Sequence, residues 1–235
     1  MKLLAFETAT EACSVALWLD GEVLERFEVA PRRHAELSLP WAEALLAEAG
    51  VARAQLDAIA IGRGPGAFTG VRLAIAIGQG IAFALDRPML PVSTLAALAY
   101  PAARDAEGAG VLAAIDARMG EVYAGAFAWR DDALHALADE ALFAPDRVAM
   151  PPGEGPWRGV GTGFAALDGA LASSLGDHFT SIDPTALPRA GAVARLAAGA
   201  WARGEAIAPE LVEPAYLRNN VALTLEQQRE ARAAR

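Results

Sequence analysis

Two acidic residues follow short apolar strands at matching places in the two halves of the sequence. Glu7 comes after Lys2–Phe6, and Asp116 comes after Val111–Ile115. In enzymes that act on phosphates, carboxylates of this kind hold a metal–nucleotide complex or orient a water molecule. The simpler alternative is that both acids only close turns of the chain.

Small residues near these acids extend the candidate nucleotide site. The hydroxyls of Thr8 and Thr10 would add contacts to a phosphate. Further along, Gly161, Thr162 and Gly163 would let a nucleotide base or ribose approach the backbone, although a strand-to-helix turn explains the same three residues. The complete candidate set is Glu7, Thr8, Thr10, Asp116, Gly161, Thr162 and Gly163.

A second glycine-rich segment, Gly62–Gly70, lies between a predicted strand and a long apolar helix. Such a segment can bind an anion, because amide groups and the helix dipole point at the ligand. It lacks the Gly-Lys-Ser/Thr of a P-loop, and Thr69 stands where a dinucleotide fingerprint has its third glycine. A tight turn with close helix packing is therefore favoured, with Thr69 as the expected N-cap.

The sequence offers little for metal binding or covalent catalysis. The three histidines, His34, His135 and His178, are far apart, and no zinc motif is present. There is no Gly-x-Ser-x-Gly elbow, and the lone Cys13 lies in a strand pattern typical of an inert buried thiol. We expect no metal site and no catalytic nucleophile, which argues against a peptidase.

The overall composition limits the class of protein. A chain of 235 residues with 54% hydrophobic residues can bury a sizeable core in one large or two small domains. The net charge of −9 argues against a dedicated nucleic-acid-binding protein, but it permits a complex in which another subunit holds the nucleic acid. A single cysteine and no recognisable signal peptide predict a cytoplasmic protein.

Hydrophobic patterns predict the elements of the first half. Three antiparallel strands open the chain, and Asp20-Gly21 is the signal for the hairpin turn between the second and third. Ser93 is the expected N-cap of the last helix in this half. The predicted strands are Lys2–Phe6, Ala12–Leu19, Glu22–Val29, Asp57–Ile61 and Met89–Val92, and the predicted helices are Ala35–Ala49, Gly70–Leu85 and Ser93–Ala103.

The polar segment Arg104–Gly110 is the predicted boundary before the second half. Each half begins with a strand, a carboxylate-bearing turn and a hairpin, which suggests a duplicated α/β protein with a cleft between its halves, unless the similarity is chance. The tail from Leu223 is expected to be a surface helix or disordered. The predicted strands are Val111–Ile115, Glu121–Trp129, Leu134–Leu142 and Arg158–Val160, and the helices are Phe164–Leu175 and Ala190–Ala202.

The long apolar helix carries small residues at four-residue spacing, namely Gly70, Ala74, Gly78 and Ala82. This edge would let another helix backbone come close. A helix that is apolar all round must be covered on all sides, either as a core helix or as an assembly surface as well. It is too short for a bilayer span and contains Arg72.

Taken together, five segments resemble the TsaB (YeaZ) family, the bacterial partner subunit of the tRNA threonylcarbamoyladenosine machinery. The resemblance implies an actin/Hsp70/sugar-kinase-like (ribonuclease H-like) fold with two related lobes. Residues 1–104, joined by the C-terminal segment 213–235, would form one lobe, and residues 105–212 the other. The matching segments are Glu7–Trp18, Gly62–Arg72, Ile115–Gly125, Val160–Gly163 and Glu213–Ala222.

The resemblance also implies a non-catalytic role beside a TsaD-type catalytic subunit and a TsaE-type ATPase. That assembly transfers a threonylcarbamoyl group to N6 of adenosine 37 in tRNAs that read ANN codons. The chain would need no cofactor of its own, since its partners would bind ATP and Mg²⁺. It would meet tRNA only through the complex, contact no membrane, and form a homodimer when alone.

The resemblance places the partner surface on two predicted helices. One is Ala35–Ala49, which has apolar residues along one side, and the other is Gly70–Leu85, which has the small-residue edge. The family commonly has Asp where this chain has Glu7. The extra methylene of glutamate would shift the carboxylate by about 1 Å, which would disturb a tight metal–phosphate geometry. An enzyme that hydrolyses ATP between the lobes stays the alternative. The expected interface residues are His34, Leu37, Trp41, Leu45, Gly70, Ala74, Gly78 and Ala82.

Overall fold

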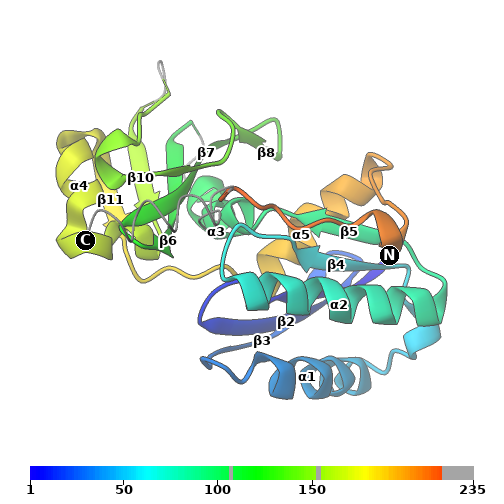
Figure 1. Ribbon diagram of the computed structural model, residues 1–235. Helices are drawn as coiled ribbons and strands as arrows, with labels where there is room; N and C mark the ends of the chain where they lie inside the picture. Colours follow the sequence, from blue (N-terminus) through cyan, green and yellow to red (C-terminus); the bar gives the residue numbers. More distant parts are fainter. Residues whose placement is uncertain (106–107, 152–154, 219–235) are drawn as a thin grey trace, which may run out of the picture.

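The computed structural model describes residues 1–105, 108–151 and 155–218 and forms two α/β lobes side by side (Figure 1). The first lobe is built on a five-stranded sheet of β1 to β5, blue to green in Figure 1, and the second on a six-stranded sheet of β6 to β11, green to yellow. The tail from Leu223 lies outside the described residues.

The first sheet begins with the three predicted antiparallel strands, which are confirmed. Asp20 and Gly21 both have positive φ (47° and 115°), as a type I′ turn requires. The next two strands join in parallel, β4 beside β1 and β5 beside β4. In spatial order the sheet contains β3 (Glu22–Val29), β2 (Ala12–Leu19), β1 (Lys2–Glu7), β4 (Ala58–Gly62) and β5 (Met89–Val92).

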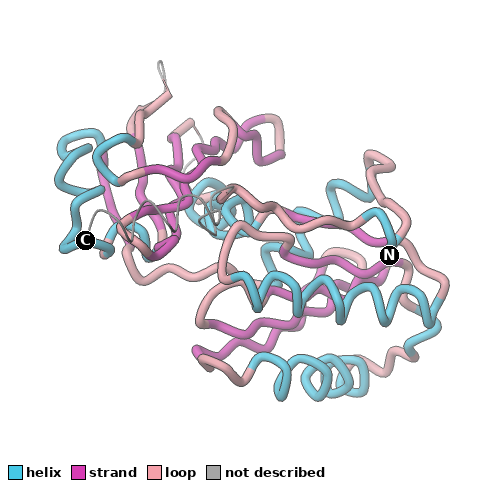
Figure 2. Tube along the Cα trace, in the orientation of Figure 1, coloured by secondary structure: helices cyan, strands magenta, loops and turns pink. Residues whose placement is uncertain are grey.

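Helices cover both faces of the first sheet (Figure 2). Successive side chains of a strand point to opposite faces, so Leu4 and Phe6 pack toward α1 and α2. Leu3 and Ala5 pack toward α3 and α5. Ser93 caps α3 as predicted, because its hydroxyl accepts a hydrogen bond from the Ala96 amide at 3.1 Å. The four helices are α1 (His34–Glu48), α2 (Phe68–Leu85), α3 (Thr94–Arg104) and α5 (Ala190–Ala202).

The second sheet repeats the topology of the first. An antiparallel hairpin runs outward on one side of β6, and two parallel strands follow on the other side. The duplication suggested by the sequence is therefore present in the strand order. The strands are β6 (Gly110–Arg118), β7 (Glu121–Arg130), β8 (Ala133–Ala136), β9 (Ala141–Phe143), β10 (Trp157–Val160) and β11 (Phe179–Asp183).

Three elements of the second lobe differ from the prediction. The expected strand Leu134–Leu142 is two short strands, β8 and β9, which both pair with β7. The expected helix Phe164–Leu175 shortens to α4 (Ala170–Leu175), because Leu167 and Asp168 adopt positive φ and interrupt it. Strand β11 was not predicted, since its largely exposed FTSID sequence carries little apolar pattern.

The chain returns to the first lobe earlier than expected. Helix α5 packs on β1 and β2 of the first sheet, although residues 105–212 were expected to stay in the second lobe. Ile207 then forms an antiparallel bridge with Met89, beside edge strand β5. The physical reason is that the first sheet has an apolar face, built from Leu3 and Ala5, which α5 buries.

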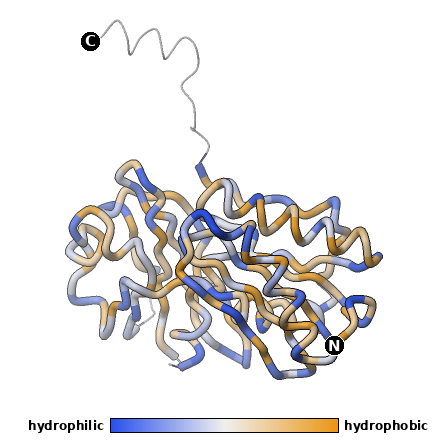
Figure 3. The backbone as a smooth tube through the Cα atoms, turned by 90° about the horizontal axis from the view of Figure 1, so that it is seen from below, coloured by the Kyte–Doolittle hydropathy of each residue, from blue (hydrophilic) through white to orange (hydrophobic). Residues whose placement is uncertain are grey.

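Single-turn 3₁₀ helices occupy several connections. Hydrophilic and hydrophobic residues (blue and orange in Figure 3) are interspersed along the chain. After the last of these helices, the segment 212–218 joins both lobes: the Ala215 amide donates to the Arg63 carbonyl at 2.8 Å, and Arg218 pairs with Glu121 at 2.7 Å. The 3₁₀ helices are η1 (Arg53–Gln55), η2 (Pro145–Arg147), η3 (Thr162–Phe164), η4 (Ala166–Gly169), η5 (Gly176–His178) and η6 (Pro209–Leu211).

Candidate functional site

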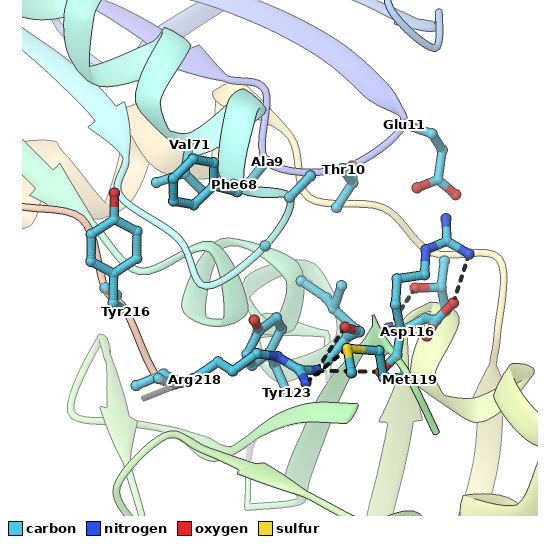
Figure 4. Close-up of a pocket in the computed structure, with 18 of the residues that line it drawn as sticks. Ala9, Thr10, Glu11, Phe68, Val71, Asp116, Met119, Tyr123, Tyr216 and Arg218 are labelled. Atoms are coloured by element: carbon cyan, nitrogen blue, oxygen red, sulfur yellow. Dashed lines mark hydrogen bonds and ion pairs between the residues drawn. The ribbon is translucent and has the colours of Figure 1, made fainter. Parts of the chain in front are cut away.

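A cavity of about 590 Å³ lies between the two lobes, within the size range of small-molecule sites. Its walls come from the loop after β1, the start of α2, the β6–β7 hairpin and residues 215–218. In Figure 4, Thr10 and Phe68 lie on one side and Asp116, Met119 and Arg218 on the other. Three of the seven predicted nucleotide-site residues line it, namely Thr10, Asp116 and Thr162.

Glu7 does not line this cleft. Its side chain is buried, accepts hydrogen bonds from the Ala9 amide at 2.7 Å and the Thr94 hydroxyl at 3.0 Å, and packs on Gly62 of β4. Burial raises the pKa of Glu7 to about 7 from an ordinary 4.5, although the hydrogen bonds oppose this rise. The carboxyl is therefore an internal polar link between β1, β4 and α3.

The two predicted threonines have different places. The Thr8 hydroxyl donates to the Gly70 carbonyl at 2.7 Å and is fully buried, so it holds the start of α2. Thr10 reaches the cleft wall, where its hydroxyl accepts a long 3.4 Å hydrogen bond from the Ala12 amide. Only Thr10 is available to a ligand in the cleft.

Of the two predicted carboxylates, Asp116 lines the cleft, where Glu11 of the β1–β2 turn is a second acidic residue. The Asp116 side chain accepts the Arg118 amide at 2.8 Å and pairs with the Arg118 guanidinium at 3.1 Å. Its own amide donates to the Thr162 hydroxyl at 3.1 Å, which ties β6 to η3. Asp116 thus orders the hairpin turn while remaining 29% exposed at the cleft.

Gly161 and Gly163 serve close packing of the backbone. A Cβ on Gly161 would overlap the Ala114 carbonyl, and its φ of 106° disfavours any other residue. Gly163 meets the same strand, where a Cβ would lie 2.7 Å from the Ala114 Cβ. Neither glycine lines the cavity.

Aromatic and basic residues at the cleft mouth were not predicted. Phe68 and Tyr216 stack with ring centroids 5.9 Å apart, and the Arg72 guanidinium lies 3.7 Å from the Phe68 ring centroid. Arg72 also donates to the Tyr216 hydroxyl at 2.6 Å. The sequence signal for these residues was membership of two matching segments, Gly62–Arg72 for Phe68 and Arg72 and Glu213–Ala222 for Tyr216.

Within residues 1–105, 108–151 and 155–218, no three His, Cys, Asp or Glu side chains come together as a metal site. Cys13 is buried, and its Sγ lies 3.6 Å from the Ser38 hydroxyl. Desolvation raises the pKa of the Cys13 thiol, which disfavours the nucleophilic thiolate.

The small-residue edge of α2 faces inward. Ala74 and Ala82 are fully buried, and Gly70 packs on the Thr8 carbonyl. A Cβ on Gly78 would lie 2.6 Å from the Met89 Cε, so this glycine lets α2 approach its own sheet. These four residues are therefore closed to a partner subunit, because the first sheet already covers them.

The predicted residues of α1 also lie on its inner side. Leu37 and Leu45 are buried, and Trp41 packs against the same core. His34 Nε2 lies 2.9 Å from the Thr10 carbonyl and 3.1 Å from the Ala12 carbonyl, which fits a ring nitrogen that donates. The surface that α1 and α2 offer is thus on their outer sides.

The outer side of α2 carries a second row of small residues, Ala76, Gly80 and Ala84, all exposed. Phe83 beside them is 59% exposed, and Leu39 of α1 is 49% exposed. A groove of about 420 Å³ separates these helices, with Gly80 and Ala84 on one wall and Leu39 on the other. We call this set of residues the outer α1–α2 face.

Helix α2 is longer than predicted. It begins at Phe68 after Ala67, so the assignment of Thr69 as N-cap was wrong. With 18 residues it is long and apolar enough to cross a bilayer by length and composition. Its inner edge is nevertheless packed on the first sheet, which places it as a layer of the α/β fold.

Comparisons with known proteins agree over most of the chain. A family model described as TsaD, tRNA N6-adenosine threonylcarbamoyltransferase, matches residues 27–225. The tRNA threonylcarbamoyladenosine biosynthesis protein TsaB of Escherichia coli is 42% identical over 228 residues, covering 94% of this chain and 96% of that protein. The Haemophilus influenzae protein of the same name is 38% identical, covering 94% and 95%.

Among solved structures, YeaZ from Pseudomonas aeruginosa is 48% identical and superposes with a TM-score of 0.85. The match covers 92% of this chain and 99% of that one. The duplicated sheets and the cleft between them define an α/β protein of the actin/Hsp70/sugar-kinase-like class. Within this class the chain belongs to the TsaB (YeaZ) family, since its full-length relatives carry that name.

Proposed function

We propose that this protein takes part in tRNA threonylcarbamoyladenosine synthesis as a non-catalytic partner of a TsaD-type subunit. Its full-length relatives are named as biosynthesis proteins of this modified nucleoside. The reaction served would be transfer of the threonylcarbamoyl group to N6 of adenosine 37 in tRNAs that read ANN codons. A cytoplasmic location fits this role, since tRNA is modified there.

The observation that carries the proposal is the outer α1–α2 face. Its exposed residues are apolar or lack a side chain, the ion pair of Arg53 with Glu43 borders the groove, and exposed apolar residues that gather in one place mark an interaction site. Ala76, Gly80 and Ala84 would let the backbone of a facing helix come close, as ridges-into-grooves packing requires. A sister subunit of the same fold has helices at the equivalent place to supply that contact.

The accessory role is supported by the position of Glu7, which is buried away from the cleft. Glu7 at the end of β1 is turned into the first lobe, where it accepts the Thr94 hydroxyl, and the first-lobe carboxylate that lines the cleft is instead Glu11 of the β1–β2 turn. We therefore assign ATP and Mg²⁺ to the TsaD-type subunit and a TsaE-type ATPase. In the same assembly tRNA would be held by the partners, which suits a chain with a net charge of −9. Without a partner, two copies would pair through the outer α1–α2 face.

Gly80→Leu tests this surface. A Cβ at Gly80 has no atom within 4 Å and leucine favours a helix over glycine, so the variant should keep or slightly raise the melting temperature of the parent protein. Overpacking of an interface costs about 1–3 kcal/mol, so affinity for the TsaD-type subunit should fall about 5-fold or more in a calorimetric titration. Ala202→Leu, at an exposed position of α5, is the matched control and should bind normally.

Equal affinity of Gly80→Leu and the parent would remove the outer α1–α2 face from the interface. A reconstitution with TsaD-type subunit, TsaE-type ATPase and the enzyme that supplies threonylcarbamoyl tests the role itself. Modification of tRNA should require this chain, and full activity in its absence would reject an activating role. Gly78→Leu is unsuitable for either test, because Gly78 faces the protein's own core.

A further inference from the structure

A second pocket between the lobes lies away from the cleft. Its volume is about 420 Å³, and its walls come from β2, α3, α5 and the β7–β8 hairpin. Trp18 on β2 pairs with Leu3 near the start of β1, whereas the cleft lies beyond the end of β1. In Figure 1 the β7–β8 hairpin extends above α3 and α5. We call this the tryptophan pocket.

Aromatic rings form much of the pocket. Trp18 and Trp129 are half-buried and come from different lobes. Tyr100 of α3 supports Trp129 in an edge-to-face contact with ring centroids 5.6 Å apart. The two indoles pack against the α3–α5 core, so their orientations are fixed before any ligand arrives. Rigid aromatic walls of this kind stack on planar rings, nucleobases included.

Two arginines face the same pocket without a carboxylate partner. The Arg195 guanidinium lies 5.7 Å from the Trp18 ring centroid, and the Arg104 guanidinium 5.9 Å from that of Trp129. Arg104 donates to the Tyr100 hydroxyl at 3.1 Å. Among the described residues, neither guanidinium is ion-paired with Asp or Glu. Asp132 also lines the pocket, and a third arginine there, Arg203, pairs with Glu205. Arginine still exceeds carboxylate at this pocket, in a chain where acids outnumber bases 29 to 20, which points to an anionic ligand.

We infer that the tryptophan pocket binds a free nucleoside monophosphate. The base stacks on an indole, and the phosphate accepts hydrogen bonds from Arg104 and Arg195, because guanidinium geometry matches phosphate oxygens. A cavity of about 420 Å³ holds one such nucleotide rather than a longer strand. This site is separate from the interlobe cleft and does not depend on the proposed partner role.

AMP binding to the isolated full-length protein in magnesium-free buffer tests the site. Calorimetry should show saturable 1:1 binding, and each of Arg104→Gln and Arg195→Gln should weaken it about 10-fold, the effect of one charge-assisted hydrogen bond. Arg53→Gln, which removes an exposed arginine paired with Glu43, is the charge-matched control and should bind AMP as the parent does. Melting curves of all variants verify that they are folded.

Tryptophan fluorescence locates the bound AMP. Its quenching should shrink in Trp18→Phe and Trp129→Phe but persist in Trp41→Phe, because Trp41 lies on the other face of the first sheet. No binding at millimolar AMP, or binding lost in Asp116→Asn and retained in both arginine variants, would overturn the assignment. A short single-stranded RNA that binds more tightly than AMP would overturn the choice of a free nucleotide.

Discussion

Glu7 and Asp116 occupy corresponding strands of two sheets with the same topology, yet their environments differ. Glu7 at the end of β1 is 1% exposed and packs on Gly62 of the neighbouring parallel strand. Asp116 near the end of β6 is 29% exposed and lines the cleft. The same position in a duplicated fold can therefore hold a buried, hydrogen-bonded carboxyl in one lobe and a carboxylate that lines the cleft in the other.

The largest effect should come from filling the space that the Glu7 carboxyl occupies. In Gly62→Ala the new Cβ would overlap that carboxyl, which is fully buried and hydrogen-bonded to Ala9 and Thr94. Overpacking together with a displaced buried polar group should lower the free energy of unfolding by about 4 kcal/mol. Urea denaturation at neutral pH measures this change.

Gly80→Ala is the matched control for Gly62→Ala. Gly80 lies in the exposed row of α2 with open space around it, so alanine should stabilise the helix by up to about 1 kcal/mol. Opposite signs for the two substitutions are thus expected from the same chemical change. A loss below about 1 kcal/mol in Gly62→Ala would show that the Glu7 carboxyl moves aside at little cost.

The pH dependence of stability should be the next largest effect. The pKa of Glu7 is about 7 in the folded protein and 4.5 ordinarily, so the folded state holds a proton that the unfolded state loses first. Its contribution to stability is complete below about pH 4.5 and is lost as pH rises to about 7. The loss should be on the order of 3 kcal/mol, since one pKa unit corresponds to about 1.4 kcal/mol.

Glu7→Gln isolates this contribution from other titrating groups. Glutamine cannot ionise, while its carbonyl can still accept the Ala9 amide. The difference in unfolding free energy between parent and variant should therefore change in favour of the variant as pH rises from about 4.5 to 7. Parallel stability curves over this range would mean that the Glu7 carboxyl is hydrated in the folded protein.

Most strands and helices, and their order, could be predicted from the sequence, because alternating or continuous apolar residues indicate which faces of an element are buried. Even the ranges of β2, β3, β5 and α5 agreed. The hairpin at Asp20-Gly21 was predictable because few residues tolerate its backbone angles. In the second lobe, β8 and β9 were merged and β11 was missed, because short edge strands bury too little to leave a pattern.

The sequence did not predict the direction in which helix faces and side chains point. The spacing of Gly70, Ala74, Gly78 and Ala82 identified a close-packing edge, but not whether the chain's own sheet or another subunit packs there. Glu7 was identified as special by type and place, while the direction of its side chain depends on Gly62, which is distant in sequence. Trp18 and Trp129 lie 111 positions apart, so only the fold brings them to one pocket.

The smallest effect should follow from Asp116→Asn. Asp116 pairs with Arg118, whose side chain is 84% exposed, and exposed pairs of this kind contribute at most about 1 kcal/mol. Asparagine can still accept the Arg118 amide that closes the hairpin turn, so the unfolding free energy should fall by less than about 1 kcal/mol.

The same variant also tests function, through the release of phosphate from ATP in the presence of Mg²⁺ by the isolated chain. An ATPase that works in the cleft would lose turnover in this variant, whereas a partner subunit shows the same background rate with Asp or Asn. A turnover that Asp116→Asn abolishes would therefore make the second lobe a catalytic one and reverse the contrast drawn with Glu7.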